Sequence, residues 1–260
     1  MSSLNNSFEP VRYAEGLYYI GTNSSPSWIL ESTDGLIMID SAMPADLEHL
    51  LEGIKKIGHD VCEIRHIIHS HAHIDHMGCT RALIDMTGAR TYMGAGDEDC
   101  AAGRNQLQWT NEFNMKYEGA FEPDVIIHDN DEIAIGNRKF RFIATPGHTR
   151  GVLTFFFNVS EKGHEYTAGM FGGAGIYSME LEYLNRYGLP VSLRDDFIRS
   201  IDRALEETVD IHLGNHLGDN MHREKILELS EDNNPFLDGS TWRIFLEKRR
   251  TEVIEFFKEH

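Results

Sequence analysis

Three histidines and an aspartate crowd into residues 71–76, within the run S-H-A-H-I-D-H-M-G-C at residues 70–79. A single histidine is usually a surface residue or a satisfied core residue. Four such groups this close together repel one another or waste hydrogen bonds unless something binds them. A divalent metal ion would do so, because imidazole and carboxylate groups are common ligands of such ions. The run therefore predicts a metal site, provided that the rest of the chain supplies further ligands.

Two glycine-containing stretches carry candidates for the further ligands. The stretch A-T-P-G-H-T-R-G carries His148, and H-L-G-N-H-L-G-D-N carries His216. Glycines allow tight backbone turns beside a bound group. Either histidine alone would be interpreted as a surface or turn residue, but together with the cluster they complete two triads. The expected ligand sets are His71, His73 and His148 for one ion, and Asp75, His76 and His216 for the other.

The remaining nine histidines are predicted not to bind metal. His69 and His212 each lie close in sequence to a predicted ligand. A role in supporting that ligand is the lesser alternative for these two residues.

These donors suit zinc and need no thiolate. Three protein ligands per ion leave a coordination position open for water, which is typical of catalytic sites. Two such ions lie about 3.5–4 Å apart, and zinc lowers the pKa of bound water to about 7. We therefore expect two zinc ions per chain and a metal-bound hydroxide that attacks a carbonyl group. Asp75 is the expected catalytic residue, which orients the hydroxide and shuttles a proton.

Each histidine loop follows a predicted strand, at 64–69, 139–144 and 209–213. Further short apolar runs predict an antiparallel meander near the N-terminus and several later strands, while helical spacing predicts the intervening helices. The order of strands, helix, strand and helix occurs twice and favours two similar halves. The fold class is therefore α/β (α+β), a four-layered αββα sandwich that forms one domain over residues 1–260. The expected strands are 17–21, 27–31, 36–40, 91–93, 125–128, 133–135, 152–159 and 165–171, and the helices 44–58, 77–87, 195–207, 223–229 and 241–258.

The composition indicates which classes of partner the protein could bind. The formal net charge of the 260 residues is −18, which disfavours nucleic acid and anionic lipid. A small-molecule substrate is expected, and no feature sets an oligomeric state. Three cysteines without a CxxC pair argue against a disulfide framework. The first ten residues lack a signal-peptide pattern, and no apolar run could span a membrane, so we expect a cytoplasmic protein, or a periplasmic one if a leader was removed.

The run S-H-A-H-I-D-H-M-G, followed by T-P-G-H-T-R-G, resembles the metallo-β-lactamase fold superfamily. The resemblance extends from L-Y-Y-I-G-T through L-I-M-I-D-S to G-N-H and N-P-F-L-D. It implies the αββα fold, with metals at one edge of the paired sheets, and carries over the same two zinc triads. It also implies hydrolysis of a lactam, thioester, lactone, phosphodiester or sulfate, or redox chemistry in some members.

The second triad, with no cysteine, is most similar to subclass B3 metallo-β-lactamases, as are G-A-G-D-E-D and I-H-D-N-D-E-I-A-I-G. Hydrolases of the glyoxalase II and lactonase kind carry a bridging aspartate on the strand after the third histidine, where this chain has Met170 or its neighbour. The serines with which subclass B3 docks a substrate carboxylate are replaced by Phe171, Gly172 and Gly173. The expected function is a zinc-dependent hydrolase that cleaves an amide or ester-type bond, with β-lactams as one candidate substrate.

Several alternatives stay open at the level of sequence. One is another hydrolase of the superfamily, such as a thioesterase, lactonase or phosphodiesterase. Another is an iron-dependent persulfide dioxygenase, although di-iron members have glutamate where this chain has His73. A metal-holding scaffold is the non-enzymatic alternative. The candidate walls of the substrate pocket are aromatic: Trp109, Phe113, Tyr177 and Tyr183.

Overall fold

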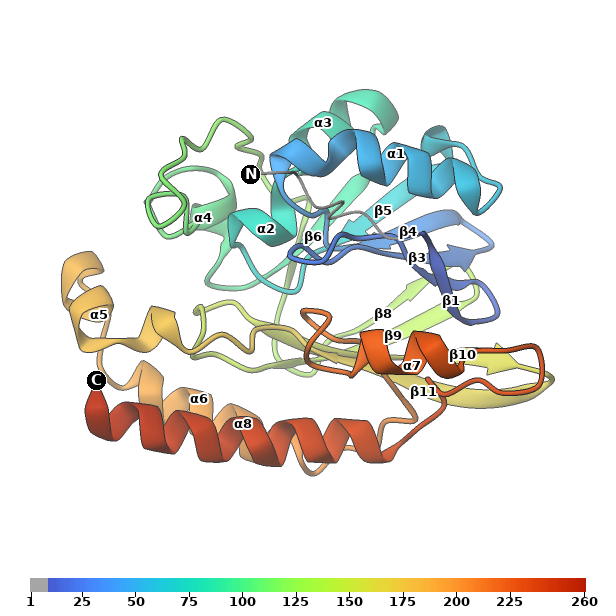
Figure 1. Ribbon diagram of the computed structural model, residues 1–260. Helices are drawn as coiled ribbons and strands as arrows, with labels where there is room; N and C mark the ends of the chain where they lie inside the picture. Colours follow the sequence, from blue (N-terminus) through green and yellow to red (C-terminus); the bar gives the residue numbers. More distant parts are fainter. Residues whose placement is uncertain (1–8) are drawn as a thin grey trace, which may run out of the picture.

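The computed structural model describes residues 9–260, so the N-terminal segment that was expected to lack a signal peptide lies almost wholly outside the described residues. Two sheets lie face to face. One has seven strands in the order β1-β2-β3-β4-β5-β6-β7, and the other has five in the order β12-β11-β10-β9-β8. Helices α1 and α3 cover the outer face of the first sheet, and α6 and α8 cover the outer face of the second (Figure 1). The predicted four-layered αββα sandwich is confirmed. That residues 1–260 form a single domain stays a prediction.

The first half of the chain builds the seven-stranded sheet. Strands β1 to β4 pair antiparallel, whereas β4 to β7 run parallel and are connected through helices. The strands are β1 (Val11–Ala14), β2 (Leu17–Tyr19), β3 (Trp28–Ser32), β4 (Gly35–Ile39), β5 (Ile64–Ile68), β6 (Arg90–Gly94) and β7 (Val125–Ile127). The helices are α1 (Leu47–Lys56), α2 (Ile74–Met77), α3 (Thr80–Thr87) and α4 (Glu98–Ala101), with 3-10 turns at Pro44–Asp46 and Val61–Glu63.

The second half builds the five-stranded sheet, which is antiparallel except for the parallel pair β11 and β12. Its strands are β8 (Glu132–Ile135), β9 (Arg138–Ala144), β10 (Leu153–Glu161), β11 (His164–Phe171) and β12 (Ile211–His212). The helices are α5 (Leu181–Tyr187), α6 (Leu193–Ala204), α7 (His222–Glu228) and α8 (Ser240–Glu259), with a 3-10 turn at Tyr177–Met179. No helix within residues 9–260 is long and apolar enough to cross a membrane.

Alternation along the strands explains the layers. On β10, Phe155 and Phe157 join the apolar cluster between the sheets, whereas Phe156 faces the cluster beneath α6 and α8. On β4, Ile37 joins the same inter-sheet cluster, and Met38 joins the cluster beneath α1 and α3. Successive strand side chains point to opposite faces, so each strand contributes to two layers of core.

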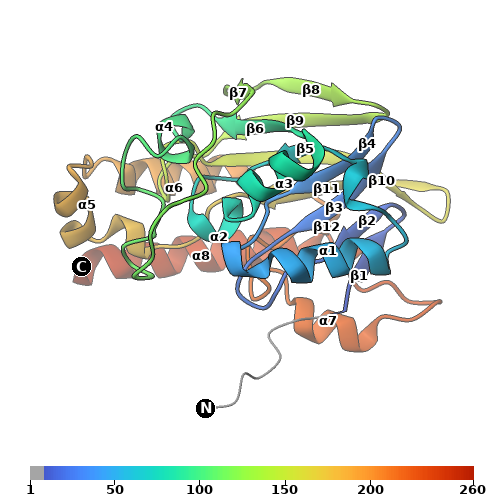
Figure 2. The ribbon, with the colours of Figure 1, turned by 90° about the horizontal axis from the view of Figure 1, so that it is seen from above.

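The structure corrects several element boundaries. The strand predicted at 209–213 is only Ile211–His212, and the helix predicted at 77–87 begins at Thr80. Asp75 and His76 lie in a single helical turn, α2. Strand β1 and helix α5 were not expected, because both are short and lack a long periodic pattern. Helices α2, α4 and α5 gather toward one end of the sandwich, at the left in Figures 1 and 2.

Candidate metal centre

The six predicted ligands meet at one edge of the two sheets. They reach it from loops after β5, β9 and β12 and from helix α2, as the strand arrangement requires. Their ligand atoms form two groups, and within each group the atoms lie within 4.8 Å of one another. The groups have the predicted membership: His71, His73 and His148, and Asp75, His76 and His216.

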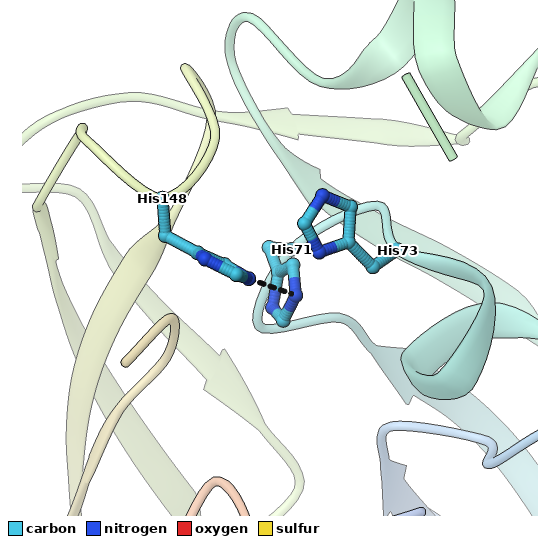
Figure 3. Close-up of side chains that lie close together, drawn as sticks. All are labelled: His71, His73 and His148. Atoms are coloured by element: carbon cyan, nitrogen blue, oxygen red, sulfur yellow. Dashed lines mark hydrogen bonds between the residues drawn. The ribbon is translucent and has the colours of Figure 1, made fainter. Parts of the chain in front are cut away.

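The first triad consists of three imidazoles. The Nε2 atoms of His71 and His148 lie 3.2 Å apart, and the ring centroids of His73 and His148 lie 4.5 Å apart. Figure 3 shows the three rings converging, His71 and His73 from one loop and His148 from another, with a dashed line joining His71 and His148. Burial holds the pKa of His71 and of His73 well below the usual value and lowers that of His148 to about 4. All three are therefore neutral at pH 7, the form of imidazole that binds metal.

The second triad adds a carboxylate. The Asp75 Oδ2 atom lies 3.5 Å from the Nε2 atom of His76 and 3.7 Å from that of His216. Burial lowers the pKa of His216. Burial also acts to lower the pKa of His76, but the Asp75 and Asp40 carboxylates outweigh it and raise that pKa. The His76 ring centroid is 4.0 Å from that of His71, so the two triads adjoin.

Hydrogen bonds orient these rings. Asp40 is fully buried, and its Oδ2 atom accepts from His76 Nδ1 at 2.8 Å and from Ser70 Oγ at 2.7 Å. His148 Nδ1 donates to the Gly175 carbonyl oxygen at 2.8 Å. Because a carboxylate and a carbonyl oxygen only accept, each ring carries its proton on Nδ1 and leaves Nε2 free as a ligand atom. Asp40 has φ +56°, in the left-handed region that non-glycine residues seldom occupy.

Asp40 and Ser70 were missed as site residues by sequence reasoning. The available signal was that L-I-M-I-D ends a strand beside the strand that precedes the cluster, and parallel neighbours end at the same edge. The supporting role considered for His69 is not observed, because its ring nitrogens contact the Tyr92 carbonyl oxygen and Thr80 Oγ1. His212 packs against Trp242 and Phe245 instead.

A cavity of about 260 Å³ opens over both triads. Trp109, Phe113 and Tyr177 line it, as expected, and the exposed fraction of Tyr177 is 63%. Tyr183 does not line this cavity. Its ring is tilted against that of Trp109, with centroids 4.8 Å apart, and it lines two neighbouring cavities, one of which is also lined by His73 and His148. The mouth of the candidate metal centre is therefore aromatic.

The donors present fit a pair of zinc ions. Five imidazoles and one carboxylate converge, and no thiolate is among them. Cys79 and Cys100 are buried and Cys62 is exposed, all three as free thiols, and none belongs to either group. Each triad would supply three protein ligands, the number found in catalytic zinc sites that keep a position for water.

With this fold and this site, the chain belongs to the Metallo-beta-lactamase superfamily, whose family description matches residues 20–160. Among solved structures it is similar to the metallo-beta-lactamase from Legionella gormanii, with 26% identity, a TM-score of 0.88 and coverage of 99% of this chain and 98% of that one. The subclass B3 metallo-beta-lactamase of Bradyrhizobium japonicum shares the fold, with 23% identity, a TM-score of 0.89 and coverage of 99% and 98%.

A different relative is similar over a shorter stretch. The hydroxyacylglutathione hydrolase of Gloeothece citriformis is 31% identical over 135 residues, which are 52% of this chain and 44% of that protein. The chain thus matches less than half of that enzyme's length. The lactamases and the hydroxyacylglutathione hydrolase are named for different substrates.

Proposed function

We propose that the protein is a dizinc hydrolase that cleaves an amide or ester-type bond in a small molecule, with β-lactams as the first candidate substrate. The observation that carries the proposal is the convergence of two three-ligand groups beneath one open cavity. Burial of histidine side chains costs desolvation free energy, and a bound cation would offset that cost. Packing alone therefore does not explain why six such side chains converge from separate parts of the chain.

The residues of the chain divide the work. His71, His73 and His148 would hold one ion, and Asp75, His76 and His216 the other. When bound, the zinc pair would supply Lewis-acid polarisation of a carbonyl oxygen and acidification of water. Asp75 lines the cavity, so its carboxylate is placed to hold a proton taken from water and deliver it to the leaving group. Trp109, Phe113 and Tyr177 would shield the scissile bond from solvent.

Three observations bear on the choice of substrate. Similarity to lactamase structures spans the whole chain and supports a lactam. Similarity to a hydroxyacylglutathione hydrolase supports a thioester as the second candidate. Strand β11 weighs against the thioester, because it ends in Met170 and Phe171, both buried, and continues into two glycines rather than a bridging aspartate.

The test combines metal analysis with a substrate panel. Protein purified without added metal should contain two zinc ions per chain and should turn over nitrocefin faster than a thioester, a lactone or a phosphodiester. The His71→Ala/His76→Ala double variant should lose both metal and activity. A matched control, His128→Ala/His164→Ala, removes two exposed histidines and should change neither.

Each contrary result has a definite meaning. Iron in place of zinc, with oxidation of a persulfide, would replace the hydrolase by the dioxygenase alternative. Bound metal without turnover of any substrate in the panel would favour a metal-holding scaffold. Full activity in the double variant would refute the proposed site.

A further inference from the structure

A buried carboxylate outside the six ligands lies between the two loops of the first triad. Asp97 follows strand β6 and precedes the short helix α4, and its exposed fraction is only 3%. Its side chain does not cap that helix. A buried carboxylate is expensive to desolvate, so its hydrogen-bond partners indicate what it stabilises.

All the described partners of this carboxylate belong to the ligand loops. Oδ2 accepts from the Ala72 backbone N–H at 3.0 Å and from Thr149 Oγ1 at 2.6 Å. Oδ1 accepts from the Gly151 backbone N–H at 2.9 Å. Ala72 lies between His71 and His73, and Thr149 directly follows His148. One side chain therefore joins the loop that carries two ligands to the loop that carries the third.

The close approach of Asp97 to the loop that carries His148 depends on Gly151. A Cβ atom on Gly151 would lie 2.6 Å from the Asp97 Cβ atom and 2.7 Å from its Cγ atom. Any other residue at position 151 would push the carboxylate away from the loops. The junction is also a contact between sheets, because the His71 loop follows β5 of the seven-stranded sheet and the His148 loop follows β9 of the five-stranded sheet.

We propose that Asp97 is a positioning residue of the first metal site, which fixes the separation of His148 from His71 and His73 and thereby sets the affinity for that ion. The inference rests on the proposed dizinc function. It assigns no such role toward the second triad, because Asp97 makes no described hydrogen bond to the residues that flank Asp75, His76 or His216.

The test measures metal binding at each site separately. Metal-free wild-type protein and its variants are titrated with Co²⁺, followed by absorption, and with Zn²⁺ against a chelator. The His148→Ala variant identifies the signal of the first site. In Asp97→Asn the amide group replaces one acceptor oxygen by a donor that faces other donors. We expect a loss of about 10- to 100-fold in affinity at the first site only.

Asp124→Asn is the matched control. Asp124 also accepts from a backbone N–H and a threonine hydroxyl, both of Thr91, but it does so at the opposite end of β6 from Asp97. This variant should bind both ions as the wild type does. If Asp97→Asn does not fold, Thr149→Val removes a single bond to Asp97 and should weaken the first site, whereas Thr149→Ser keeps the hydroxyl and should restore it.

Four outcomes bear on the inference. Selective weakening of the first site in Asp97→Asn, or in Thr149→Val with recovery in Thr149→Ser, supports it. Unchanged affinity, or equal weakening of both sites, overturns the positioning role and leaves the dizinc function intact. A wild-type protein that binds no metal overturns both the function and the inference.

Discussion

His71 and His148 lie 77 positions apart in the sequence, follow strands of different sheets, and bring their Nε2 atoms to 3.2 Å from each other. Ser70 Oγ gives its proton to Asp40 Oδ2, so at 3.1 Å it accepts from His71 Nδ1, and His148 Nδ1 donates to the Gly175 carbonyl oxygen. Each neutral ring therefore carries its one proton on Nδ1 and a lone pair on Nε2. Two lone pairs that face each other at this distance repel, and a shared cation removes the repulsion. The pair is therefore the most direct structural sign of the first metal position.

Removal of His148 should empty that position alone. His148→Ala leaves His71 and His73 with two of three ligands, whereas Asp75, His76 and His216 keep all three. We expect one zinc ion per chain in place of two, and a fall in kcat/KM of at least about 100-fold, since loss of even an outer partner lowers activity 10- to 100-fold. Elemental analysis and nitrocefin kinetics check this. Two retained ions would show that His148 is not a ligand.

Asp40 should matter for metal affinity although it is not a ligand. Its carboxylate accepts from His76 Nδ1 at 2.8 Å and from the Ser70 backbone N–H at 2.7 Å. Asp40→Asn replaces one acceptor by a donor, so the His76 ring loses its anchor. We expect zinc affinity at the second site to fall about 10- to 100-fold. Chelator competition measures it.

A second Asp–His pair provides the control for Asp40. Asp34 Oδ2 lies 3.2 Å from His66 Nε2, but Asp34 lies in the turn between β3 and β4, at the opposite end of β4 from Asp40. Asp34→Asn should leave zinc affinity unchanged. Equal affinity loss in both variants would mean that Asp40 acts through general stability rather than through the His76 ring.

The two groups of candidate ligands could be predicted from sequence because they are local in two respects. Four of these residues lie within residues 71–76, and His148 and His216 each follow a strand beside glycines. The strands before these residues end at the same edge of the sheets, so the loops that follow them meet there. This expectation does not depend on which residues pair between the strands. The alternation of apolar residues similarly fixes the two sheets and their outer helices.

The supporting carboxylates could not be predicted in the same way. Asp40 reaches His76 only because β4 pairs with β5 in one particular register, and Asp97 reaches Thr149 only through a contact between sheets. Strand β12 is shorter than predicted because the parallel pairing with β11 covers only Ile211 and His212.

Gly172 should not tolerate a side chain. It is one of the residues that stand where subclass B3 has the serines that dock a substrate carboxylate. A Cβ atom at this position would lie 2.0 Å from the Leu153 carbonyl oxygen, a backbone atom that cannot move aside. We expect Gly172→Ala to lower the free energy of unfolding by about 1–3 kcal/mol in urea denaturation. Gly218→Ala, with no atom within 4 Å of the added Cβ, should change it by less than about 0.5 kcal/mol. Equal stability of the two variants would show that the β11 end can rearrange to accept a serine.

His212 should make stability depend on pH independently of the metals. Burial against Trp242 and Phe245 lowers the pKa of His212 to about 3 from an ordinary value of 6.5. Because the folded pKa lies below the unfolded one, the full contribution is present above pH 6.5 and is lost as the pH falls toward 3. Between pH 7 and pH 5 the free energy of unfolding should drop by about 2 kcal/mol from this residue. His212→Leu, which removes the titrating ring, should lack that part of the drop when metal-free proteins are compared in urea. An identical pH dependence of the variant and the wild type would mean that His212 is hydrated and protonates in the folded state.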